Sequence, residues 1–179
     1  MLVPGGATEP ITFRCKCCGE EHTGLPTFAF TFPIQYLDVP ESERDARVFL
    51  TSDTCVIDDE HFFVRGCLEI PVYGSDDPFV WGVWVSLSEP NFFRFQELLD
   101  VEVRSQHGPF FGWLCSPPKP YPDSLHLKTQ VHLRDRGIRP SIVLEPTDHP
   151  LAIEQREGIS SERVAEIYEV MIHGGRPPA

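Results

Sequence analysis

Apolar and polar residues alternate along several segments of the chain, and this period of two predicts β-strands. In the longest segment, residues 61–73, every second side chain is apolar or glycine, so we expect these positions to face the core. Residues 54–57 precede it across an acidic turn, and the two segments together predict a β-hairpin. The positions expected to face the core are Phe62, Val64, Gly66, Leu68, Ile70 and Val72.

Three further segments complete the predicted sheet. Residues 79–88 carry large apolar side chains on both faces, which is typical of a central strand that is covered on both sides. Residues 125–133 alternate again, and residues 141–145 are expected to lie beside them after the turn at residues 135–137. The polar face of the segment 125–133 consists of His126, Lys128, Gln130 and His132.

Three segments predict helices. Residues 40–47 begin with acidic and end with basic side chains, which complements the helix dipole. A second helix is expected to start at Ser88 or Pro90 and to continue to about Val101. The last helix starts at Ser160 or Ser161 and is closed by Gly174. Its apolar stripe consists of Val164, Ile167, Tyr168, Met171 and Ile172.

These elements predict an α+β fold with a mostly antiparallel sheet of about five or six strands and three or four packed helices. The order of the elements lacks the regular βαβ alternation of a doubly wound fold. A chain of 179 residues fits one domain. Residues 1–10 are rich in proline and glycine and are expected to form a flexible tail, and residues 11–179 a single domain with an N-terminal cysteine knuckle.

Charge and hydropathy narrow the classes of partner. The formal net charge is −12, and no basic patch in the sequence offsets it. The negative electrostatic field of the protein is therefore expected to repel a nucleic-acid backbone. No apolar run reaches the roughly 18 residues that a membrane helix requires, and residues 1–10 lack the features of a signal peptide. We therefore expect a cytoplasmic protein that binds neither nucleic acid nor membrane.

The cysteines supply the clearest candidate chemistry. Cys15 and Cys18 stand in a C-x-x-C-G turn, where two thiolates grip one metal ion and Gly19 lets the backbone curl around the sulfurs. His22 follows four residues after Cys18 and is the natural third ligand. The sequence thus predicts a structural zinc site at Cys15, Cys18 and His22, with further candidate ligands in the hairpin at Cys55, His61 and Cys67.

Other interpretations of the cysteines and of the acidic residues remain open. The cysteines, including Cys17 and Cys115, are equally compatible with reduced structural thiols, whereas a redox role is disfavoured because no helix follows the C-x-x-C turn. Cys55 with His61 as its base is a weaker hypothesis than a buried cysteine. The acidic residues at the hairpin, Asp53, Asp58, Asp59 and Glu60, are explained by turn chemistry before a cation site or an acid/base pair.

Two more residue sets, one of histidines and one of aromatic residues, have structural explanations. His126 and His132 share a strand face but stand about 20 Å apart along an extended chain, too far to bind one metal ion together. An aromatic set is interpreted as core in preference to a ligand groove. Its members are Trp84, Phe110, Phe111, Trp113 and Tyr121. The sequence also lacks the common signatures of hydrolases, metalloproteases, NTPases and dinucleotide-binding enzymes.

Five stretches carry a resemblance that spans residues 13–173: residues 15–26 (CKCCGEEHTGLP), 50–72 (LTSDTCVIDDEHFFVRGCLEIPV), 79–88 (FVWGVWVSLS), 110–114 and 149–158. They resemble a bacterial family known only as domain of unknown function 2199. The pattern of that family has C-x-x-C-G-x-x-H near its start, and Cys15, Cys18, Gly19 and His22 occupy these places. The resemblance favours the metal hypothesis and implies no activity, ligand or partner.

The leading hypothesis is a bacterial protein that acts by binding or regulation and is not primarily a catalyst. A compact acidic domain suits an inhibitor of another protein, such as an immunity protein that neutralises a basic toxin, because its charge steers the association. The alternative is a metal- or thiol-dependent enzyme whose site lies near the N-terminal cysteine cluster, with the aromatic face as its substrate pocket.

Overall fold

Ten strands, four α-helices and two short 3-10 helices occupy residues 10–174, the part of the chain that this computed structural model describes. Apart from Pro10, the predicted tail lies outside the described residues. The strands are β1 (Thr12–Arg14), β2 (Glu21–Thr23), β3 (Thr27–Ala29), β4 (Val48–Leu50), β5 (Thr54–Ile57), β6 (His61–Ile70), β7 (Phe79–Leu87), β8 (Phe110–Leu114), β9 (Lys128–His132) and β10 (Ser141–Leu144). The helices are η1 (Ile34–Asp38), η2 (Glu41–Glu43), α1 (Arg44–Arg47), α2 (Glu89–Glu97), α3 (Pro150–Glu157) and α4 (Ser161–His173).

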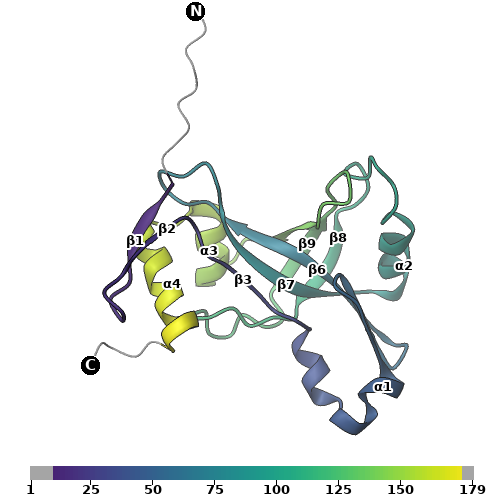
Figure 1. Cartoon of the computed structure of the whole chain (residues 1–179). Helices are drawn as coiled ribbons and strands as arrows, with labels where there is room; N and C mark the ends of the chain where they lie inside the picture. The colour runs from purple at the N-terminus through teal and green to yellow at the C-terminus, as the bar shows by residue number, and fades with distance from the viewer. Residues whose placement is uncertain (1–9, 175–179) are drawn as a thin grey trace, which may run out of the picture.

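The predicted α+β class is confirmed. The prediction of a mostly antiparallel sheet was wrong. The five strands β6, β7, β8, β9 and β10 form a closed mixed barrel, because β10 pairs back onto β6 in parallel at Ser141 and Cys67. β6 and β7 are the long central strands of Figure 1 and pair antiparallel from Phe62 with Leu87 to Ile70 with Phe79. Long twisted strands coil as they pair, which lets the last strand meet the first.

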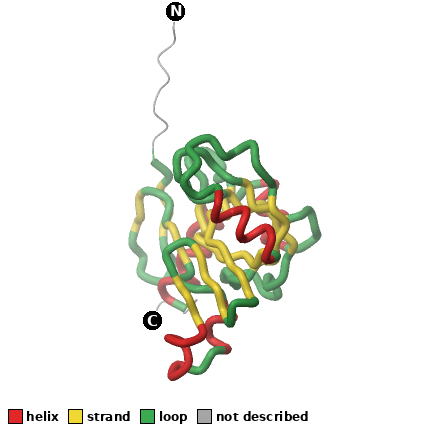
Figure 2. The backbone as a smooth tube through the Cα atoms, turned by 90° about the vertical axis from the view of Figure 1, so that its right-hand side faces the viewer, coloured by secondary structure: helices red, strands yellow, loops and turns green. Residues whose placement is uncertain are grey.

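The interior of the barrel is apolar, and the predicted facing of β6 is confirmed. Val64, Leu68 and Ile70 have no exposed surface. The helix α2 lies across one end of the barrel in Figure 2, and its Phe92 ring stands 5.1 Å from the ring of Phe62. Further buried side chains complete this core: Trp81, Val83, Val85, Phe95, Leu114, Val131, Ile142, Leu151, Val164 and Ile167.

A second, smaller core covers the outer face of β5, β6 and β7. It gathers Cys55, Phe63, Trp84 and Cys115 beneath the segment that carries Val39. The Trp84 indole Nε1 donates a hydrogen bond of 2.9 Å to the Phe30 carbonyl, so the polar atom of this buried ring is satisfied. This core explains why β7 is apolar on both faces, as its sequence predicts.

Several boundaries differ from the sequence expectations. The helix expected at residues 40–47 is a 3-10 turn followed by a single α-turn, and α2 ends at Glu97. The strand expected from residue 125 begins at Lys128, because His126 adopts a φ of 63° in a turn. The helix α3 has no counterpart among the predicted elements. Within residues 10–174, no helix has both the length and the apolar character needed to cross a bilayer.

The tight packing of the barrel wall yields a first prediction. A Cβ atom at Gly112 on β8 would lie 2.3 Å from the Ser86 carbonyl oxygen and 2.4 Å from the Val85 side chain. We expect Gly112→Ala to lower the free energy of unfolding by about 1–3 kcal/mol, because the wall must shift to admit one methyl group. Lys128→Ala, at an exposed position on the neighbouring strand, serves as the control.

Urea denaturation of both variants provides the measurement. The control is expected to stay within about 0.5 kcal/mol of the parent protein. If the two variants unfolded at the same urea concentration, the close approach of β7 and β8 at Gly112 would be contradicted.

Candidate metal centre

The N-terminal cysteines lie in a short closed loop between β1 and β2. These strands pair antiparallel from Thr12 with Thr23 to Arg14 with Glu21. Inside the loop, the Cys15 N–H donates to the Glu20 carbonyl and the Gly19 N–H donates to the Cys15 carbonyl, both at 2.9 Å. Gly19 has a φ of 74°, a conformation that favours glycine. The curled turn predicted from the C-x-x-C-G spacing is therefore present.

This hairpin packs against α4, whose sequence lies about 150 residues further along the chain. The ring of His22 stacks on Phe13 at 5.3 Å between centroids and lies 4.6 Å from the ring of Tyr168 on α4. The Lys16 N–H donates to the Glu169 carboxylate at 2.5 Å. In Figure 1 the two elements lie side by side, so the last turns of α4 are held against the cysteine loop.

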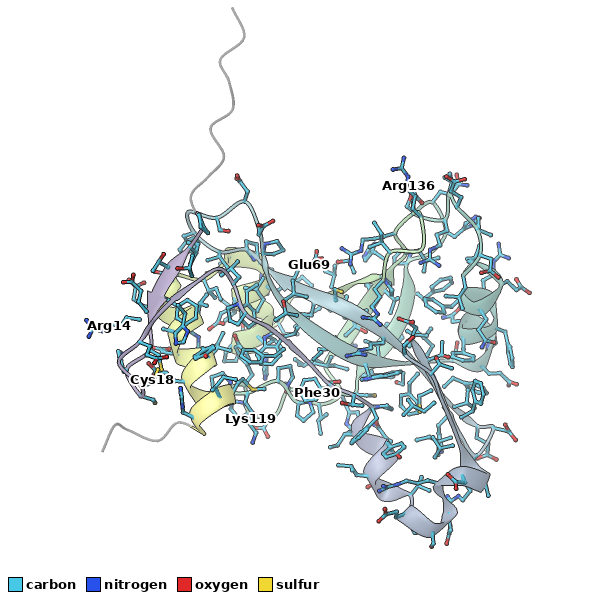
Figure 3. The ribbon with its side chains drawn as sticks, viewed as in Figure 1. Arg14, Cys18, Phe30, Glu69, Lys119 and Arg136 are labelled. Atoms are coloured by element: carbon cyan, nitrogen blue, oxygen red, sulfur yellow. The ribbon has the colours of Figure 1, made fainter. Side chains whose placement is uncertain are left out.

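Two overlapping groups of metal-binding atoms result. One ligand atom each from Cys15, Cys18 and His173 all lie within 4.8 Å of one another. A second group joins Cys18 to Glu20 and His22 within the same limit. Figure 3 shows Cys18, the residue common to both groups, beside the C-terminal end of α4.

The spacing of Cys18 and His22 matches a metal site. Their Sγ and Nε2 atoms are 3.7 Å apart, which is also within range of a thiol–imidazole hydrogen bond. Tetrahedral zinc with one sulfur at about 2.3 Å and one nitrogen at about 2.0 Å places these two ligands about 3.5 Å apart. The pair therefore needs almost no movement to share an ion.

His173 at the end of α4 has a buried polar atom that the described residues leave unsatisfied. Nε2 of His173 is buried and has no hydrogen-bond partner within residues 10–174. A buried nitrogen without a partner costs about 1–3 kcal/mol, which coordination of a metal ion would recover. Cys15 beside it is fully buried, whereas Cys18 is exposed.

Crowding of the thiols opposes their ionisation when no cation is present. Desolvation, the Glu169 carboxylate and Cys15 raise the pKa of the Cys17 thiol. At Cys18 the backbone N–H of Glu20 lowers the pKa, but desolvation and the neighbouring Cys15 outweigh it, and the net pKa is raised. A divalent cation reverses this balance because it binds the thiolate form.

The structure thus places the three sequence-predicted ligands in one hairpin, with Cys15 and Cys18 in its loop and His22 on β2. Cys18 belongs to both metal-binding groups, whereas Cys15 and His22 fall in different groups, and His173 joins Cys15 and Cys18. Sequence reasoning missed His173 because nothing local connects it to the cysteines; the one signal was a histidine in the last turn of an amphipathic helix. The hairpin residues do not join them: in the described part of the chain, neither metal-binding group includes Cys55, His61 or Cys67.

The hypothesis that Cys55 is a nucleophile activated by His61 lacks support. Cys55 has no exposed surface, and burial raises the pKa of its thiol to about 12. His61 is exposed on the outside of the hairpin. A thiol in this setting is the buried apolar residue that its strand position indicates.

Two of the four acidic residues of the hairpin, Asp53 and Asp58, are engaged in ion pairs. Asp58 and Asp59 both have a φ of 55° in the three-residue turn between β5 and β6, a conformation that aspartate tolerates better than most residues, and Asp58 pairs with Arg47 at 2.6 Å. Asp53 pairs with Arg139 at 2.6 Å. The interpretation as turn residues therefore fits better than a cation site.

The aromatic set is divided between core and surface. Trp84, Phe110 and Tyr121 are buried, as the core interpretation requires. Phe111 and Trp113 are about 40% exposed on the outer face of β8, with their rings in an edge-to-face contact at 5.2 Å. These residues do not line a common groove with the cysteine loop.

A cavity adjoins the cysteine loop on the side of the N-terminal end of α4. Its volume is about 560 Å³, which lies in the size range of small-ligand pockets. Arg14 and Lys16 give it two cationic groups, and Glu162 gives it one carboxylate. The remaining lining residues are Thr12, Phe13, Cys15, Gly19, Ser161 and Ala165.

Comparison with known proteins finds one match. The profile of a family described as "Uncharacterized protein conserved in bacteria (DUF2199)" matches residues 14–159. No curated protein and no solved structure matches the chain. The matched segment includes Cys15, Cys18 and His22 and ends before α4.

The contrast in thiol environments yields a second prediction. After removal of metal with a chelator, iodoacetamide at pH 8 is expected to label the exposed Cys18 at least about tenfold faster than Cys55. Iodoacetamide attacks the thiolate. The Cys55 thiol, with a pKa of about 12, forms almost no thiolate until the pH approaches that value.

Peptide mass spectrometry of the folded protein measures both rates. Labelling of Cys55 is expected to rise only as the pH increases towards 12 or when the protein is unfolded. Equal rates at the two cysteines in the folded protein would contradict the burial of Cys55.

Proposed function

Since the chain belongs to the DUF2199 family of uncharacterised bacterial proteins, we propose its function from the site itself. The protein is a non-catalytic binding or regulatory protein in which a structural zinc ion fastens the N-terminal hairpin to α4. The proposed ligands are Cys15, Cys18, His22 and His173. The observation that carries this proposal is the approach of His173 to within 4.8 Å of both Cys15 and Cys18.

The donor set favours zinc over the common alternatives. Two thiolates and two imidazoles form the Cys2His2 combination that zinc takes in closed structural sites. Magnesium and calcium require oxygen ligands, which the cluster offers only at Glu20. The unsatisfied Nε2 of His173 supports a role in coordination.

A closed site supports a structural role for the ion. Four protein ligands fill a tetrahedral shell and leave no position for a substrate or a reactive water. The cross-link joins Cys15 and Cys18 to His173 at the far end of the described chain, so it secures the packing of the hairpin on α4. Thiolate ligands persist in a reducing compartment, and we propose a cytoplasmic location.

The proposed binding role is supported by charge. A formal net charge of −12 creates a field that speeds association with a basic protein. An inhibitor of the immunity-protein type needs such steering and a rigid surface, and it requires no catalytic group. The partner is accordingly proposed to be a basic protein.

A metal-dependent enzyme is the second candidate, and the cavity of about 560 Å³ beside Cys15 favours it. In this arrangement Cys15, Cys18 and His173 hold the ion, and His22 stays outside the shell. The fourth position then carries a water whose pKa the zinc ion lowers to about 7. The identity of the fourth ligand separates the two candidates.

The zinc content of the protein tests the proposal. Untagged protein purified without added zinc is expected to hold one zinc ion per chain by elemental analysis. Cys15→Ser, Cys18→Ser and His173→Ala are each expected to weaken zinc binding by at least about tenfold, because each removes a ligand. Cys67→Ser and His132→Ala, which change residues outside the cluster, are the matched controls and should retain the metal.

Two further variants decide the role of the ion. Loss of zinc in His22→Ala, with retention in Glu20→Gln, is expected for the closed structural site. Full retention in both variants would instead favour the open site of an enzyme. Metal-free, folded wild-type protein that binds no added zinc would refute both arrangements.

A further inference from the structure

A fork in the barrel wall lies far from the metal centre, at the end of the barrel that α2 covers. Along one edge of β6, β5 pairs with the first half and β10 begins at the second half. At the junction the Arg65 N–H donates to the Asp53 carbonyl, and the Cys67 N–H donates to the Pro140 carbonyl, both at 2.8 Å. The segments that carry β5 and β10 therefore diverge on either side of Gly66.

A cavity of about 370 Å³ opens at this fork. One wall is formed by Phe95 and Gln96 of α2 and by Leu99 in the turn that follows it, and Phe49 also lines the cavity with 66% of its surface exposed. A volume of this size holds a small organic molecule. The apolar side chains supply contacts for a hydrocarbon or aromatic body.

The charge of this cavity is opposite to that of the whole chain. Arg65, Arg104 and Arg139 line it against a single carboxylate, Asp53, so its formal charge is +2 in a protein of formal charge −12. A concave site with low-dielectric walls concentrates such a local field. The fork is thus a basic site on an acidic protein.

Arg104 has a structural task in this site. Its side chain is 2% exposed, and it donates to the carbonyls of Arg134 at 2.8 Å, Leu99 at 3.1 Å and Ile138 at 2.9 Å. These bonds attach the 134–138 loop to the end of α2. Arg104 therefore adds positive charge to the cavity while its donors are used by the protein.

Arg139 and Arg65 have hydrogen-bond donors that the protein does not fully use. Arg139 donates to Asp53 through Nε at 2.6 Å, while its Nη2 has only a contact of 3.5 Å to the Ser52 carbonyl. Among the described residues, Arg65 forms no ion pair, and its buried Nε has no acceptor. Its other contacts are long: Nη1 lies 3.5 Å from the Ser52 carbonyl, and the guanidinium carbon lies 5.9 Å from the centroid of the Trp84 ring. Desolvation and the Arg139 charge lower the pKa of Arg65, which an anion in the cavity would reverse.

We propose that the cavity at the fork binds a small organic anion, with Arg65 and Arg139 holding a carboxylate or phosphate group and α2 covering an apolar body. Guanidinium groups match both oxyanions in a planar, two-pronged geometry. The walls formed by Phe95 and Leu99 favour an aromatic or aliphatic body over a free inorganic ion. The site needs no contribution from the metal centre.

Calorimetric titration of the full chain with phenyl phosphate, benzoate and inorganic phosphate tests the proposal. Phenyl phosphate or benzoate is expected to bind, and inorganic phosphate more weakly because it lacks the apolar body. Arg65→Gln and Arg139→Gln are each expected to weaken binding by about tenfold or more. Arg136→Gln is the matched control, since Arg136 does not line the cavity and lies at the tip of the neighbouring loop in Figure 3.

A second measurement uses the unsubstituted protein and therefore does not depend on whether the variants fold. In protein labelled with 15N, the arginine Nε–H signals of Arg65 and Arg139 are expected to shift during titration, while that of Arg136 stays in place. Absence of binding by both organic probes would overturn the proposal. So would equal weakening in Arg136→Gln, or saturation without a shift at Arg65.

Discussion

The closure of the barrel at β6 is the constraint on which the rest of the structure depends. One edge of β6 pairs with β7 over nine residue pairs, whereas its other edge is shared between β5 and β10. The closure requires a glycine at position 66, because a Cβ there would lie 2.6 Å from Ile142 and 2.8 Å from the Pro140 carbonyl. Sharing one edge between two strands closes the wall and also opens the fork.

The two proposed sites lie at opposite ends of this barrel, as Figure 1 shows from the positions of α2 and α4. The fork uses arginines fixed by barrel strands and by the end of α2. The proposed metal centre would join the hairpin of β1 and β2, whose strands are three residues long, to the last helix. A cross-link between Cys15 and His173 closes a very long loop. Such a cross-link lowers the conformational entropy of the unfolded chain and thereby stabilises the folded state. The ion would therefore secure a hairpin too small to be stable alone.

Much of the fold could be predicted, because local patterns determine it. The alternation of β6 predicted its position and its buried face, and the C-x-x-C-G spacing predicted the cysteine loop. The apolar stripe predicted the position of α4 and the burial of Val164 and Ile167, whereas Ile172 of the same stripe is 53% exposed. Barrel closure depends on one long-range parallel pairing, Ser141 with Cys67, which no local period records. The same reason hides His173 and the arginines of the fork, since both sites assemble residues that are distant in sequence.

X-ray absorption at the zinc edge, on protein purified without added metal, tests the central claim most directly. The account predicts a four-coordinate ion with two sulfur ligands at about 2.3 Å and two nitrogen ligands at about 2.0 Å. A shell made only of oxygen and nitrogen, or one with a single sulfur, would contradict the assignment of Cys15, Cys18, His22 and His173 as its ligands.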